Sequence, residues 1–270
     1  MSSRRLHSAT LAVMVLLTAL LTGCASTPAG VSDYDPIEPV NRKVYGFNNA
    51  LDRHVLKPVA DTYIRVTPQP ARTAFAHFFD NVAYLNVILN DFLQGKVKQG
   101  FSDSGRFVIN TTIGVLGLFD PATGMGLPAH DEDLGQTFAV WGTPQGAYLV
   151  LPFFGPDTVR DTPNLGLATV TNLLFYIGNP WVSIPLGVLD VISTRAQANA
   201  SLEMVQQAAL DPYIFVREGY LQHRQYLIFD GNPPPQLFEQ FNDGLTLPGQ
   251  GLPPPGQSGM KQAPNAPAER

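Results

Sequence analysis

The sequence predicts a mainly α-helical protein. Apolar residues recur at helical spacing in several segments, and proline or glycine interrupts the pattern between them. Only 14% of the residues are charged, where soluble domains have about 25%, so the polar helix faces carry Asn, Gln and Thr rather than Lys and Glu. Periodicity alone favours an ordinary helical domain whose apolar stripes meet in a core. The alternative is a ring of helices whose polar faces line a wet interior.

The first helix is predicted to begin at Asp35 and Pro36. An aspartate suits the N-cap position, and proline suits the first helical position because its missing N–H is not needed there. An apolar stripe follows, and Asn41 and Asn48 lie on the opposite face. Pro58 is expected to end or kink this helix.

Two further helices are predicted before residue 120. The second spans about 70–94, carries Arg72 on its polar face, and ends before a glycine that suits a helix C-terminus. The third lies within 96–116 and places Arg106 and Asn110 one turn apart. Both helices therefore present polar residues along one face.

The middle of the chain holds two long segments without charge. In residues 134–156 a weak alternation predicts two short strands and a loop from Gly142 to Gly146. Residues 162–189 contain too many prolines and asparagines for one transmembrane helix. Two medium helices joined at Asn179–Pro180 fit that segment better.

The C-terminal part is predicted to contain two helices and a tail. An Ala/Gln-rich helix covers 193–210, and Asp211–Pro212 repeats the N-cap-then-proline pattern at the start of a last long helix. Residues 231–270 contain nine of the 24 prolines, which predicts a disordered tail. The helical domain is therefore expected to span 35–230.

The N-terminus has the pattern of a bacterial export signal. Arg4 and Arg5 precede an apolar segment over 11–21, which is too short to cross a bilayer of about 30 Å. The segment ends in Leu-Thr-Gly followed by Cys24, the only cysteine, and this resembles the lipobox of bacterial lipoproteins. We expect residues 1–23 to be removed and residues 24–34 to form a lipidated tether.

Acylation of Cys24 would fix the mature chain to a membrane. Each buried methylene contributes roughly 0.8 kcal/mol, so several long chains anchor a protein in effect permanently. Ala25 stands where an aspartate would favour retention at the inner membrane, and it therefore suggests the outer membrane. The alternative is a plain secretory signal followed by a buried free cysteine. A single cysteine excludes an internal disulfide and a Cys-rich metal site.

The sequence contains no catalytic motif that would indicate an enzyme. Gly100-Phe-Ser-Asp-Ser104 lacks the second glycine of a nucleophile elbow, and no H-E-x-x-H, P-loop or G-x-G-x-x-G sequence occurs. His54, His77 and His223 lie on predicted helices, where surface or cap roles are favoured over catalysis. We therefore predict no catalytic residue and no cofactor.

Two polar motifs allow a binding role, but a simpler interpretation is preferred for each. The run from His130 to Asp133 could bind a cation, although a solvated acidic loop fits its contiguous acids better. Arg160 and Asp161 could face a phosphate or form a local salt bridge, and the salt bridge is preferred. The net charge of −5, without a basic block, argues against nucleic-acid binding.

Short motifs in a fixed order resemble the MlaA (VacJ) family of outer-membrane lipoproteins from residue 35 to about 230. Each motif is weak alone, but their order and spacing are specific. They are the segments Asp35–Arg42, Tyr45–Asn48, Pro68–Arg72, Phe92–Gly95, Arg106–Asn110, Leu151–Gly155, Thr194–Gln197 and Asp211–Tyr213.

The resemblance implies a ring-like arrangement of amphipathic helices around a central polar channel, with a short hairpin-like loop. Such proteins lie in the inner leaflet of the outer membrane beside trimeric porins. They take mislocalised phospholipids from the outer leaflet and pass them to a periplasmic carrier, which delivers them to an ABC transporter complex in the inner membrane. No cofactor and no covalent chemistry are implied. A structural envelope lipoprotein that organises porins without moving lipid is the alternative function.

Candidate site residues follow from the polar helix faces and the resemblance. The candidates for lining the channel or binding headgroups are Asn41, Asn48, Arg72, Arg106, Asn110 and Arg160. A structural hydrogen bond is the alternative for each of them. The segment from Gly142 to Gly146 corresponds to a glycine-flanked loop near the family's pore. Its two glycines are hinge candidates for a gate, which Pro144 would stiffen.

Overall fold

A computed structural model of the chain describes residues 35–234. The described chain is mainly helical and divides between Arg217 and Glu218 into two compact units. The described part of the second unit holds the end of the last helix and a short turn. The predicted signal peptide, the lipidated Cys24 with its tether, and the tail from residue 235 onward lie outside the described residues.

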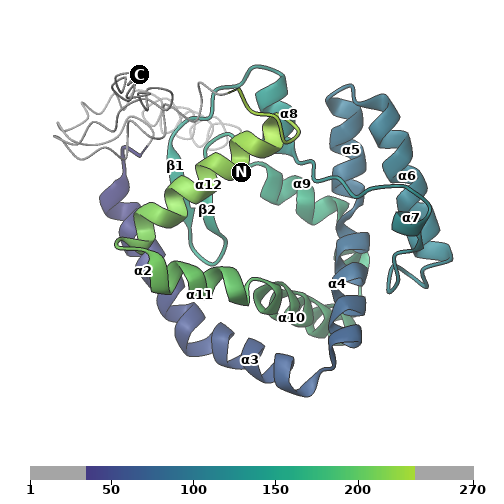
Figure 1. Ribbon diagram of the computed structural model, residues 1–270, viewed down its shortest axis with the longest axis horizontal. Helices are drawn as coiled ribbons and strands as arrows, with labels where there is room; N and C mark the ends of the chain where they lie inside the picture. The colour runs from purple at the N-terminus through teal and green to yellow at the C-terminus, as the bar shows by residue number, and fades with distance from the viewer. Residues whose placement is uncertain (1–34, 235–270) are drawn as a thin grey trace, which may run out of the picture. The chain divides into compact units, whose positions relative to one another are not determined.

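The elements follow one another closely along the chain (Figure 1). In order they are α2 (Glu38–Leu51), a π-helical turn (Asp52–Leu56), α3 (Lys57–Val66), α4 (Gln69–Ala83), α5 (Leu85–Leu93), α6 (Val97–Thr112), α7 (Pro121–Gly124), α8 (Leu134–Val140), β1 (Tyr148–Leu151), β2 (Gly155–Thr158), α9 (Asn164–Thr171), a 3₁₀ turn (Leu173–Tyr176), α10 (Pro180–Gln197), α11 (Asn199–Ala208) and α12 (Pro212–Ile228).

The start of the first helix differs from the prediction. Helix α2 begins at Glu38, after Ile37, and no side chain caps it. Asp35 is fully buried instead and accepts hydrogen bonds from distant residues. Pro58 does not end the helical path, because a π-helical turn leads into α3 and places this proline in the first turn, where its missing N–H costs little.

The predicted second helix is two helices. Helix α4 ends at Ala83, and α5 begins at Leu85 after a bend at Tyr84. Gly95 ends α5 with a φ of 78°, as its position predicted. Helices α5 and α6 then lie side by side (Figure 1).

The hairpin lies later in the sequence than predicted. The first expected strand is helix α8, which Asp133 caps by accepting a hydrogen bond from the Gln136 N–H at 2.8 Å. Strands β1 and β2 pair antiparallel in the register Tyr148↔Thr158. The loop from Gly142 to Gly146 therefore precedes the hairpin.

The predicted boundaries near residues 179 and 211 are confirmed. The Asn179 side chain accepts a hydrogen bond from the Trp181 N–H at 3.0 Å and caps α10. Asp211 accepts one from the Tyr213 N–H at the start of α12, also at 3.0 Å. The predicted Ala/Gln-rich helix is wrong in extent, because α10 continues to Gln197 and a break at Ala198 separates it from α11.

Contacts in the first unit connect its elements in a closed circuit. Helix α2 contacts β1, β1 pairs with β2, and the chain continues from β2 into α9. Helix α9 contacts α5, where the Asn86 amide donates to the Asn164 side chain at 3.3 Å. The circuit returns through contacts of α5 with α4, α4 with α10, and α10 with α3, which leads back to α2. This order agrees with the ring-like arrangement that the family resemblance implies.

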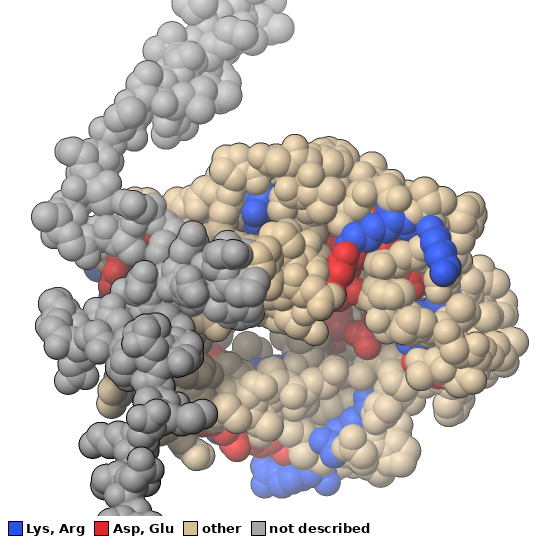
Figure 2. Space-filling model, turned by 45° about the horizontal axis from the view of Figure 1, so that its top comes forward, with Lys and Arg blue, Asp and Glu red and all other residues tan. Residues whose placement is uncertain are grey.

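Polar residues are buried in the described chain more often than apolar ones, which does not fit an ordinary helical core. The largest fully buried side chains include Gln136, Asn41 and Asn90. Large apolar side chains are exposed, among them Trp181 (87%) and Phe153 (71%). Uncharged residues cover most of the face shown in Figure 2, and charged residues gather in a few groups. Within residues 35–234, none of the helices has both the length and the hydropathy needed to cross a bilayer.

Candidate functional site

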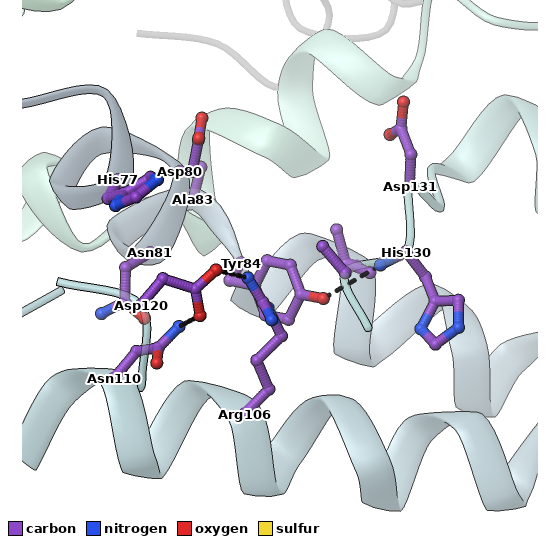
Figure 3. A pocket seen from close by; sticks show the side chains of 12 residues that line it. His77, Asp80, Asn81, Ala83, Tyr84, Arg106, Asn110, Asp120, His130 and Asp131 are labelled. Atoms are coloured by element: carbon purple, nitrogen blue, oxygen red, sulfur yellow. Dashed lines mark hydrogen bonds and ion pairs between the residues drawn. The ribbon is translucent and has the colours of Figure 1, made fainter. Parts of the chain in front are cut away.

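Helices α4, α5 and α6 enclose a polar cavity of about 380 Å³, which we call the Arg106 cavity. Figure 3 shows polar side chains from α4, α6 and the segment 120–131 around it. Arg106 and Asn110 both reach this cavity from α6, so the predicted one-turn spacing does bring them together.

Asp120 holds the two predicted residues in place. Its carboxylate forms a 2.5 Å ion pair with Arg106 Nη2 and accepts a 3.0 Å hydrogen bond from the Asn110 amide. Arg106 also donates to Thr123 Oγ1 at 2.8 Å. Burial opposes ionisation of Asp120, but hydrogen bonds from Thr123, Arg106 and Asn110 outweigh it and lower the pKa of this carboxyl to about 2. Asp120 therefore stays ionised and fixes the arginine.

A second polar cavity of about 450 Å³ lies between α3, α4 and α10, and we call it the Arg72 cavity. Its lining residues are Tyr63, Gln69, Arg72, Thr73, Ala76, His77, Asp80, Ser193, Ala196 and Gln197. His77 and Asp80 also line the Arg106 cavity, so the two cavities adjoin along α4.

A third, more open cavity of about 1020 Å³ adjoins the Arg106 cavity. It lies between the start of α6 and residues 126–130, and Lys96, Lys98 and Gln99 contribute to its wall. It shares His130 with the Arg106 cavity. Cavities thus extend along one side of α4 and across the start of α6.

The opposite side of α4 is apolar. Phe75, Phe78 and Phe79 line a cavity of about 160 Å³ together with Leu116, Leu118 and Leu186. Helix α4 therefore separates a polar space from an apolar one, which agrees with the polar and apolar faces that its sequence predicts.

The other predicted site residues make structural hydrogen bonds. The Asn41 amide donates to the Tyr148 carbonyl at 3.0 Å, and its oxygen accepts from the Val150 N–H at 2.9 Å. The Asn48 amide donates to the carbonyl of Leu151, the last residue of β1, at 2.9 Å. These bonds attach α2 to β1.

The remaining predicted pair and the loop glycines have clear local roles. Arg160 and Asp161 form the expected local salt bridge at 2.8 Å, and both residues are buried. Gly142 and Gly146 have φ values of 89° and 70°, a backbone region that favours glycine.

The expected solvated loop at 130–133 is wrong, because its residues are engaged with the helices. Glu132 is buried and forms a 2.7 Å ion pair with Lys96. His130 Nδ1 lies 2.8 Å from the buried carboxylate of Asp103. Tyr84 donates a 2.9 Å hydrogen bond to the same carboxylate. Sequence reasoning missed this cluster because its members come from α5, α6 and a loop.

Asp91 lies in the same cluster and is fully buried. Burial, followed by hydrogen bonding to Asp103 and repulsion from it, raises the pKa of the Asp91 carboxyl to about 8. The folded protein therefore retains a proton that the unfolded chain has lost between about pH 4 and pH 8. Its contribution to stability is complete below this window and is lost as the pH rises through it.

Replacing Asp91 with Asn should remove this pH dependence, because the amide imitates the protonated acid and keeps an oxygen for Gln99. We expect similar stability of Asp91→Asn and the unmodified protein near pH 4 and greater stability of the variant near pH 8. Denaturant unfolding followed by circular dichroism across this range measures both. Parallel curves for the two proteins would contradict the assignment.

Comparison with known proteins places this arrangement in a family. Residues 33–227 match the family model described as MlaA lipoprotein. The chain belongs to the MlaA lipoprotein family. All four cavities lie inside the matched region.

Relatives named intermembrane phospholipid transport system lipoprotein MlaA include proteins of Escherichia coli K12 and Haemophilus influenzae. The protein of Escherichia coli K12 is 37% identical over 84% of this chain and 91% of its own length. The protein of Haemophilus influenzae is 32% identical over 80% of this chain and 91% of its own length. An uncharacterised protein of Rickettsia felis is 35% identical over 71% of this chain and 77% of its own length.

A solved structure has a similar fold. It was determined in work on the structural basis for maintenance of bacterial outer membrane lipid asymmetry. The match has a TM-score of 0.63 and 33% sequence identity, and it covers 72% of this chain and 98% of the solved chain.

Proposed function

We propose that this protein is an outer-membrane lipoprotein that removes mislocalised phospholipids from the outer leaflet and passes them to a periplasmic carrier. The names of the Escherichia coli and Haemophilus influenzae relatives and the subject of the solved structure support this function. The observation that carries the proposal is the inverted burial of the described chain, in which polar side chains lie inside and large apolar ones outside.

This inversion suits a protein immersed in one leaflet. Exposed apolar side chains on α10 can face acyl chains, because moving apolar surface from water into lipid is favourable. Charged groups are costly at membrane depth unless they are enclosed, and Arg106, Arg160 and Arg195 are all buried and paired with carboxylates. A lipid headgroup could then follow the polar cavities while its tails remain on the apolar side of α4.

The proposed setting follows from the lipobox and the family. Cys24 anchors the chain to the inner leaflet of the outer membrane, beside a trimeric porin. The periplasmic carrier takes the lipid and delivers it to the inner-membrane ABC transporter complex. The segment between Gly142 and Gly146 is proposed to gate the path. Lipid moves without any covalent step, so no catalytic residue or cofactor is assigned.

Trp181 tests the immersion directly, because it is 87% exposed at the start of α10. We expect its fluorescence to shift to shorter wavelength when the protein enters phospholipid vesicles and to be quenched by brominated acyl chains. A Trp141→Phe background isolates this signal, since the chain has two tryptophans. Quenching by aqueous iodide but not by brominated lipid would contradict immersion.

Transport is tested by filling the polar path. Ala76 lines the Arg72 cavity, and Ala76→Trp should block it without adding charge. Cells carrying this variant should accumulate outer-leaflet phospholipid, detected with a membrane-impermeant amine reagent, and become sensitive to detergent, as deletion cells should. Ala50→Trp makes the same change at an exposed position on α2 and should behave as the unmodified protein.

The same variants separate transport from the structural alternative. A protein that only organises porins should tolerate Ala76→Trp, because its outer surface is unchanged. Unaltered leaflet asymmetry both in deletion cells and in Ala76→Trp cells would overturn the transport function. Asymmetry lost on deletion but kept in Ala76→Trp cells would support the structural role.

A further inference from the structure

We propose that the Arg72 cavity binds a zwitterionic, ethanolamine-type phospholipid headgroup, with Tyr63 and Arg72 holding the phosphate and Asp80 the ammonium group. The inference rests on the proposed function and adds to it the class of headgroup that is recognised and the residues that recognise it.

Two buried hydrogen-bond donors in this cavity wall need an acceptor. Tyr63 Oη on α3 and Arg72 Nε on α4 are both shielded, and neither has a hydrogen-bond partner among residues 35–234. Burying such groups without a partner costs free energy. Since a guanidinium can only donate, a partner for Arg72 must supply acceptor oxygens.

Phosphate oxygens meet this requirement. A guanidinium offers several N–H groups in a planar fork, which fits a phosphate better than it fits a single carbonyl. Arg72 is already oriented, because its Nη2 donates to the Gln69 side chain. Thr73, Ser193 and Gln197 add polar groups around the same space.

Asp80 supplies the opposite charge at the other end of the cavity. It is exposed there, and no hydrogen bond joins it to another described residue. The charge of Arg106, which lines the adjoining cavity, attracts the Asp80 carboxylate, but Arg106 is already paired with Asp120. The Asp80 carboxylate is therefore available to a cation from outside the protein.

The separation of the two charges fits one headgroup. Arg72 and Asp80 lie eight residues apart on one face of α4, which corresponds to a rise of about 12 Å. An extended phosphoethanolamine group with a hydrogen bond at each end covers a distance of this order. The lining contains one arginine and one aspartate, so a zwitterion is matched. A phosphatidylglycerol headgroup carries the same phosphate but ends in uncharged hydroxyls, so it offers no cation to Asp80.

Calorimetric titration of the delipidated full-length protein in neutral detergent tests the assignment. Short-chain phosphatidylethanolamine should bind about tenfold more tightly than short-chain phosphatidylglycerol. Tyr63→Phe should weaken both lipids by about tenfold, whereas Asp80→Asn should bring the two affinities close together. Tyr176→Phe is the matched control, since it removes a hydroxyl that lies outside the cavity and bonds to Val170.

Further readouts separate recognition from folding and from free phosphate. Without lipid, Tyr63→Phe should be at least as stable as the unmodified protein, because the lost hydroxyl has no partner to leave unpaired. Glycerophosphoethanolamine should compete for the site, and inorganic phosphate should compete poorly.

Three results would overturn the inference. The first is equal affinity of the protein for the two lipids, and the second is lipid binding by both Tyr63→Phe and Asp80→Asn that matches binding by the unmodified protein. The third is competition by inorganic phosphate as strong as that by glycerophosphoethanolamine. In each of these cases lost leaflet asymmetry in Ala76→Trp cells would still support transport. The failure of the headgroup assignment is therefore distinguishable from failure of the proposed function.

Discussion

Replacing Asp35 with Asn is expected to destabilise the protein by at least about 3 kcal/mol, which is typical when one member of a buried ion pair is removed. Asp35 is fully buried and accepts hydrogen bonds from Asn41, Tyr213 and Arg217 at 2.9, 2.6 and 2.9 Å. These donors come from both ends of the first unit. Losing the carboxylate that accepts their hydrogen bonds should therefore weaken the attachment of the start of α12 to α2. The measurement is denaturant unfolding in detergent, followed by circular dichroism.

Asp211→Asn is the matched control for this experiment. Asp211 pairs with Arg42 at 2.9 Å, but both side chains are more than a third exposed. An asparagine keeps the oxygen that caps α12, and loss of such an exposed pair costs less than about 1 kcal/mol. If the two variants lost equal stability, the buried cluster around Asp35 would not hold the chain ends as described.

Gly117→Ala is expected to cost about 3 kcal/mol or more, because two independent penalties combine. Gly117 has a φ of 89°, which strains any residue with a β-carbon. A β-carbon there would also lie within 2.7 Å of the Asn81 side chain. Asn81 lines the Arg106 cavity, so a shift of this loop should disturb the cavity as well as the fold. The thermal unfolding midpoint is the measurement.

Gly105→Ala provides the contrast within the same region. Gly105 lies inside α6, and an added β-carbon would meet only the Leu127 side chain at 3.8 Å. Alanine favours a helix interior over glycine by up to about 1 kcal/mol, so this variant should be neutral or slightly more stable. Destabilisation of Gly105→Ala to the extent of Gly117→Ala would contradict the packing described for this loop.

Local turn chemistry predicted many helix ends, and tertiary contacts explain where it failed. Asp211–Pro212 begins α12 as predicted. The same dipeptide at Asp35 does not cap its helix, because the carboxylate is taken by Tyr213 and Arg217, far away in the sequence. The alternation that predicted a strand near residue 138 is too short to outweigh the cap at Asp133.

The candidate site could be predicted only where it depends on one helix. Helical spacing brought Arg106 together with Asn110, but Asp120 comes from a loop, and nothing in the sequence links it to them. Arg72 and Asp80 share a helix face that periodicity reveals. Tyr63 was missed because the Arg72 cavity also needs α3 and α10, whose packing is a property of the whole fold.

The central claim is that apolar helix surfaces face lipid while polar cavities admit water. Because Cys24 is the only cysteine and is expected to be acylated, single cysteines can carry nitroxide spin labels at chosen positions. Labels at Ile184 and Val188, which are 63% and 53% exposed on α10, should collide mainly with oxygen dissolved in the lipid. Labels at Ala76 and Ala83, which line the polar cavities, should collide mainly with a water-soluble nickel complex. The reverse pattern, or the same accessibility at all four positions, would contradict the account.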